Sequence, residues 1–100
     1  MKEEVINQYV DRILDLFKIT REDFFKKEKK RNLVDARHLL YYLCSERNIK
    51  QIIIRDFMRK NGHNIPHQSV RHGIEIVREK VQEDKDYQSI VKEIEKSVFI

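Results

Sequence analysis

Residues that break helices are scarce in this sequence, which has one proline (Pro66) and two glycines (Gly62 and Gly73) among its 100 residues. It also has no serine- and glycine-rich tract that would mark a linker. Lysine, glutamate, isoleucine and leucine are abundant, as is typical of helical proteins. We therefore expect one all-α domain spanning residues 1–100, with a core of modest size.

Cysteines and long apolar runs are also few. Cys44 is the only cysteine, so no internal disulfide can form, which is typical of proteins in the reducing cytoplasm. It lies in an apolar stretch, where we expect a buried and unreactive thiol. No apolar run approaches the roughly 18 residues that a membrane span needs, and the start MKEEV has no apolar signal-peptide core. We expect a cytoplasmic protein without membrane contact.

The residue patterns of common enzymes and metal sites are absent as well. No G-x-x-x-x-G-K-[ST] motif is present to hold nucleotide phosphates. His63 and His67 are separated by a proline and a turn, while His67 and His72 do not share a helix face, and no second cysteine could complete a zinc site. Cys44 and His38 are six residues apart, with nothing to orient a base toward the thiol. We expect no enzymatic activity, no cofactor and no metal.

The positive charge of the chain is concentrated in its middle. The net charge is +4, and the sequence pI is about 9.2. Residues 21–31 carry six basic and three acidic side chains, and residues 50–80 carry seven and three. Residues 1–20 carry three basic and four acidic side chains, and residues 81–100 carry three and five. Such a patch suits a surface that binds phosphates.

Apolar residues recur at spacings of three and four, which predicts amphipathic helices. The pattern covers residues 5–17, 33–44, 52–58, 70–81 and 87–98, and the apolar pair 24–25 adds a short helix. Within residues 52–58, three consecutive isoleucines could also form a strand, but their charged surroundings favour a helix. The sequence therefore predicts five or six short helices and no sheet.

Local signals mark the ends of several of these helices. Thr20 followed by Asp23 resembles a capping box at the start of the short helix. Asn48 is a plausible end of the helix that begins near Leu33. Asn61-Gly62 is the strongest turn signal in the chain, and a new helix from Pro66 to about Gln82 follows it.

The fourth helix, this turn and the helix from Pro66 form a candidate helix-turn-helix. In this motif the second helix inserts its first turns into the major groove, while its opposite face packs on the core. If Val70, Ile74, Val77 and Val81 are buried, the side chains near the start of that helix face outward. We predict base contacts from His67, Gln68, Arg71 and His72. The alternative is an amphipathic helix that merely displays polar residues to water.

Three segments carry a resemblance to a known family. VDRILDLFKITREDFFKKEKKRN (10–32), VDARHLLYYL (34–43) and HQSVRHGIEIV (67–77) occur in the order and spacing of the C-terminal domain, domain IV, of the bacterial replication initiator DnaA. That family typically shows an A-R-Q-x-A-M-Y-L-like helix and an R-D-H-T-T-V-x-H-A signature. The matching positions are Ala36, Arg37, Tyr42, Leu43, His67, Ser69, Val70 and His72, with Gly73 in place of the last alanine.

The resemblance implies a Trp-repressor-like helix-turn-helix that binds double-stranded DNA. It also implies a role in the control of replication initiation or of transcription, in a bacterial cell or in a bacteriophage that carries the domain alone. Ile65-Pro66 replace the signature Arg-Asp, and Gln68 replaces the first threonine, so we expect a site other than the DnaA box. MRKNGHNI (58–65) is expected to be an insertion in the turn, formed by a longer helix end and a tight loop. The ATPase domain of that family is absent, so we expect no ATP-driven melting of DNA.

Contacts to the DNA backbone are predicted from basic and polar side chains around this element. They are Lys27, Lys29, Lys30, Arg31, Arg37, Arg59, Lys60, His63 and Ser69. For the run KKEKKR (26–31), the alternative is a solvated loop. For Arg37, the alternative is a surface ion pair with Glu46 or with the neighbourhood of Asp35.

A second class of function stays open. The C-terminal helix is acidic, and Val98, Phe99 and Ile100 form an apolar end. Such a surface could dock on a protein partner or on a second copy of the chain. The alternative function is therefore a helical interaction or assembly module that ignores DNA, for example an accessory or structural protein of a phage.

Overall fold

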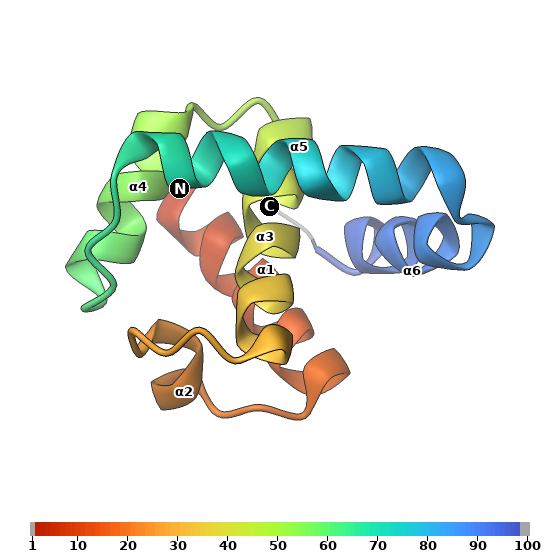
Figure 1. Cartoon of the computed structure of the whole chain (residues 1–100). Coiled ribbons are helices and arrows are strands. Elements are labelled where there is room, and N and C mark those ends of the chain that lie inside the picture. Colours follow the sequence, from red (N-terminus) through yellow and green to blue (C-terminus); the bar gives the residue numbers. More distant parts are fainter. Residues whose placement is uncertain (1, 99–100) are drawn as a thin grey trace.

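The third helix is the centre of the fold, and four other helices pack against it (Figure 1). The computed structural model describes residues 2–98, which form six α-helices and no strand. The helices are α1 (Lys2–Phe17), α2 (Arg21–Phe25), α3 (Arg31–Glu46), α4 (Gln51–Lys60), α5 (His67–Glu83) and α6 (Lys85–Lys96). The predicted all-α class is therefore confirmed.

The core forms from the apolar stripes that the spacing predicted. Tyr9, Val10 and Ile13 of α1 are buried against α3, as is Phe24 of the short α2. Cys44 is fully buried, and burial raises the pKa of its thiol. The structure thus confirms the buried thiol that the sequence predicted.

The helix ends follow most of the predicted signals. The Thr20 side chain accepts a hydrogen bond from the Asp23 backbone N–H at 3.1 Å, which confirms the cap of α2. The three isoleucines after Gln51 are helical, and α4 continues through Lys60. Pro66 occupies the N-cap position of α5 rather than its first turn. The last helix begins earlier than Tyr87, because the Asp84 side chain accepts bonds from the backbone N–H groups of Asp86 and Tyr87.

The segment between α4 and α5 turns sharply after Asn61. Gly62 has a φ of +96°, a left-handed conformation that favours glycine. The backbone N–H of His63 donates to the Met58 carbonyl at 2.8 Å, which closes the end of α4. Residues 58–65 therefore consist of three residues of helix, Met58 to Lys60, followed by a tight loop, as expected, while their status as an insertion stays a prediction.

Helix α5 lies unusually close to α3 at Gly73. A Cβ atom at this position would lie 2.7 Å from Cδ2 of His38 and 2.7 Å from Cδ2 of Tyr41. Any larger side chain would therefore force the rings of His38 and Tyr41 out of their positions. No helix in residues 2–98 is long and apolar enough to cross a membrane. Of the predicted apolar end, Val98 is buried in the core, and Phe99 and Ile100 lie outside the described residues.

Candidate nucleic-acid interface

The first half of α5 separates apolar from polar side chains. Val70, Ile74 and Val77 are buried, and Val81 is half-buried. The four residues predicted to contact bases are all exposed on the other side of the helix: His67, Gln68, Arg71 and His72. Their predicted exposure is confirmed, and their contact with DNA stays a prediction.

A basic segment of residues 26–31 joins α2 to the start of α3. All of its side chains are exposed. Lys26 pairs with Asp23 at 3.6 Å, and Arg31 pairs with Asp35 at 3.6 Å. Among the described residues, Lys27, Lys29 and Lys30 form no ion pair within 4 Å. The segment therefore presents uncompensated cations to solvent.

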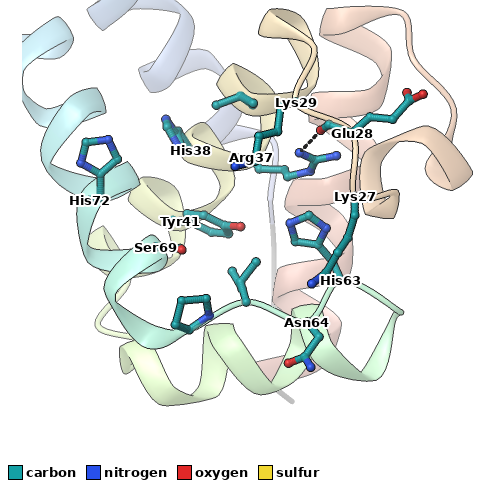
Figure 2. Close-up of a pocket in the computed structure, with 13 residues that line it drawn as sticks. Lys27, Glu28, Lys29, Arg37, His38, Tyr41, His63, Asn64, Ser69 and His72 are labelled. Carbon is teal, nitrogen blue, oxygen red and sulfur yellow. Dashed lines mark hydrogen bonds between the residues drawn. The ribbon is translucent and has the colours of Figure 1, made fainter.

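A cleft of about 470 Å³ separates the basic segment from the start of α5 (Figure 2). Its walls come from three parts of the chain that are distant in sequence: the basic segment, one face of α3, and the α4–α5 loop with the start of α5. The lining residues are Lys27, Glu28, Lys29, Val34, Arg37, His38, Tyr41, His63, Asn64, Ile65, Pro66, Ser69 and His72. The structure thus brings together two groups of residues that the sequence predicted separately.

Two histidine rings meet inside this cleft. The ring of His38 on α3 lies edge-on to the ring of His72 on α5, with 5.7 Å between their centroids. Nδ1 of His38 is buried and has no hydrogen-bond partner. Burial lowers the pKa of His38, and the neighbouring His72 lowers it further. The sequence did not predict that His38, or Tyr41 one helical turn away, would line this cleft. Their position next to Arg37 on one face of α3 was the only available signal.

The structure contradicts the phosphate contact predicted for Arg37. This side chain is only 5% exposed, and its guanidinium donates to backbone carbonyls. Nε donates to the Phe24 carbonyl at 2.7 Å, Nη1 to that of Glu28 at 2.9 Å, and Nη2 to that of Lys26. The alternative of an ion pair with Glu46 or near Asp35 is also wrong, because these carbonyls take up the donors of the guanidinium instead.

The backbone contact predicted for His63 is wrong for a similar reason. The residue is 6% exposed, and its Nδ1 lies 3.3 Å from the Phe25 carbonyl oxygen. Burial lowers the pKa of His63, and the charge of Arg37 adds to that effect. His63 therefore attaches the α4–α5 loop to α2 rather than reaching out to a ligand.

The two basic residues at the end of α4 lie in different surroundings. Both are exposed, and Nε of Arg59 donates to Oδ1 of Asn64 at 3.2 Å, beside the cleft. Lys60 pairs with Glu3 of α1 at 2.9 Å, where it lines a separate hollow between α1 and α4. The structure does not bring Lys60 together with the cleft. Ser69, which is half-buried, does line it.

No group of three or more histidine, cysteine or carboxylate side chains within residues 2–98 is arranged to hold a metal ion. Comparison of the chain with protein families, with curated proteins and with solved structures found no match. The geometry of the cleft and its surroundings therefore carries the functional argument.

Proposed function

We propose that this protein binds double-stranded DNA in a sequence-specific manner through α4, the following loop and α5. The single observation that carries the proposal is the exposed row His67, Gln68, Arg71 and His72 on a helix whose opposite face is buried. Arginine and glutamine can each form two hydrogen bonds with a base edge in the major groove. The start of α5 is the part of the molecule that would enter that groove.

The basic segment supports this proposal because it adds phosphate-binding charge beside the reading helix. Lys27 and Lys29 lie across the cleft from Ser69 and His72 of α5 (Figure 2). With α5 in the major groove, the backbone of one strand would pass over this cleft. Exposed lysines that neutralise phosphates release counterions and supply affinity that is independent of sequence. The basic segment on one side of the cleft would thus position the DNA backbone, and α5 on the other side would read the bases.

The biological role that we propose is control of replication initiation or of transcription in the cytoplasm of a bacterial cell. The resemblance to DnaA domain IV motivates this role and remains an interpretation of the three sequence segments. The chain would act as a DNA-binding regulator, encoded by the host or by a bacteriophage.

Selection of bound sequences from a random duplex library tests the proposal directly. The expected result is enrichment of one short motif, with specific binding roughly 10³-fold or more tighter than binding to random duplex. Affinity for both duplexes should fall steeply as salt rises. If no duplex binds at low salt, the proposal is wrong. If every duplex binds equally, the sequence-specific part is wrong.

One observation favours a second candidate, a protein-interaction or assembly module. An apolar groove of about 390 Å³ lies between the second half of α1 and α6. Leu16 and Ile90 line it and are 45% and 39% exposed. Self-association through this C-terminal helix would appear in analytical ultracentrifugation as a concentration-dependent mass, and Ile90→Glu should abolish it. Monomeric behaviour at all concentrations would remove the self-association form of this candidate.

A further inference from the structure

We infer that Arg37 is a positioning residue that holds the basic segment in the conformation required for binding. The inference rests on the proposed function for its consequence in DNA affinity, but its structural part can be tested without DNA. Arg37 lies on α3, and its three nitrogen donors reach the carbonyls of Phe24, Lys26 and Glu28, which lie 9 to 13 residues earlier in the sequence. Figure 2 shows the bond to Glu28.

These carbonyls belong to backbone that has few other bonds. Helix α2 has only five residues, and the carbonyls at the end of a helix have no partner within it. Arg37 donates to Phe24 and to Lys26, at the end of α2 and just beyond it. Its bond to Glu28 lies in the middle of the basic segment. Residues 27–29, in the middle of the segment, form no backbone–backbone hydrogen bond in the described part of the chain.

The charges of the basic segment favour a disordered backbone, and the hydrogen bonds from Arg37 oppose this tendency. The segment carries five cations within six residues, and like charges at this spacing repel one another and favour an open chain. A segment that becomes ordered only upon binding must lose conformational entropy at that moment, which lowers the affinity. Arg37 reduces that loss in advance, because it binds the backbone at Lys26 and Glu28 within the segment and at Phe24 just before it.

A guanidinium suits this role and an ammonium does not. The guanidinium is planar and has donors that point in several fixed directions, so one side chain can bind several carbonyls at once. Lysine would keep the positive charge but could not donate to several carbonyls in these fixed directions. Arg37→Lys therefore separates the geometry of the side chain from its charge.

The test compares Arg37→Lys with Arg47→Lys, a control at the C-cap of the same helix. Arg47 is half-buried, and it donates to Tyr9 Oη at 3.4 Å, away from the cleft. The first readout is the backbone ¹⁵N order parameter of residues 27–30. We expect rigid values of about 0.85 in the wild type and below about 0.6 in Arg37→Lys, with no change in Arg47→Lys.

The second readout is affinity for the selected duplex and for a random duplex. Arg37→Lys should weaken both about tenfold and preserve the ratio between them, because the reading helix is unchanged. Arg37→Gln should behave in the same way if it folds, and far-UV circular dichroism checks that both variants keep their helices. A rigid segment in Arg37→Lys, or wild-type affinity in that variant, would overturn the inference. If the wild type binds no duplex, the proposed function fails, while the order parameters still decide whether Arg37 positions the segment.

Discussion

The two ends of α5 differ in how completely they are attached to the rest of the protein. At its C-terminal end, Lys80 pairs with Asp35 at 3.8 Å and lies over the ring of Tyr87, and Asp84 then caps α6. In Figure 1, α6 folds back beside this end of α5. At its N-terminal end, no side chain caps the helix, and His67 and Gln68 are exposed. The contrast indicates that one end fixes the helix and the other is available to a ligand.

The largest effect is expected from replacing Gly73, where α5 packs closely against α3. Gly73→Val places side-chain atoms where a Cβ alone would already lie 2.7 Å from His38 and Tyr41. The free energy of unfolding should fall by about 2 to 3 kcal/mol, because overpacking displaces the rings of His38 and Tyr41 between α5 and α3. Urea denaturation measures this change. The matched control is Gln82→Val, which puts the same side chain at an exposed position of α5. An equal loss in both variants would show that helix propensity, and not the close approach, is responsible.

The second prediction concerns cations of the basic segment, which faces the N-terminal end of α5 across the cleft. Replacement of Lys29, Lys30 and Arg31 by glutamine should weaken binding to every duplex by about 100-fold if all three side chains contact phosphates. The slope of log affinity against log salt should become shallower by about 2.7 for the same reason. Fluorescence anisotropy over a range of salt concentrations measures both quantities. The control is the same charge change at Lys85, Lys92 and Lys96 of α6, and equal slopes in the two triple variants would refute a local role for the basic segment.

The third prediction sharpens the comparison within α5 itself. Arg71→Ala should reduce discrimination between the selected duplex and its single-base variants by about 1 to 3 kcal/mol, because one base contact is lost. Arg78 is equally exposed but lies in the second half of the helix. Arg78→Ala should leave the discrimination unchanged while it removes the same charge. Loss of discrimination in both variants would mean that the reading surface is not confined to the start of α5.

The sequence predicted most of the fold because its signals were local. Spacings of three and four located the helices, and Thr20 and Asn61-Gly62 marked boundaries that the structure confirms. The buried valines of α5 also predicted which of its side chains would be exposed. The start of α6 was missed, although Asp84 is of a residue type that commonly caps helices and its two bonds are local.

The candidate site was less predictable, since its decisive contacts join distant parts of the chain. A charged residue is normally solvated, so nothing local indicated that Arg37 would be buried against carbonyls up to 13 residues away. The burial of His63 against Phe25 spans 38 residues. The same holds for His38 and His72, whose rings meet next to the close approach at Gly73. Sequence periodicity reports which face of a helix is buried, but it does not report what that face meets.

The smallest expected effect is a dependence of the free energy of unfolding on pH. It is expected from two histidines that line the cleft, His38 and His63. Burial lowers the pKa of His38 and of His63 in the folded protein. His72, Lys80 and Arg37 also lower the pKa of His38, whereas the Asp35 carboxylate raises it. Arg37 and Lys27 likewise lower the pKa of His63.

As pH falls below about 6.5, the unfolded chain takes up protons that the folded protein does not, so the free energy of unfolding should decrease. The stability that these groups contribute is therefore complete above that pH and is lost as pH falls toward their folded pKa values. Urea denaturation at intervals between pH 7.5 and pH 5 should show this decrease, and His38→Gln should make it shallower. His67→Gln, which alters an exposed histidine at the free end of α5, is the matched control. A decrease that is as steep in His38→Gln as in the wild type would exclude the buried ring as a source of the pH dependence.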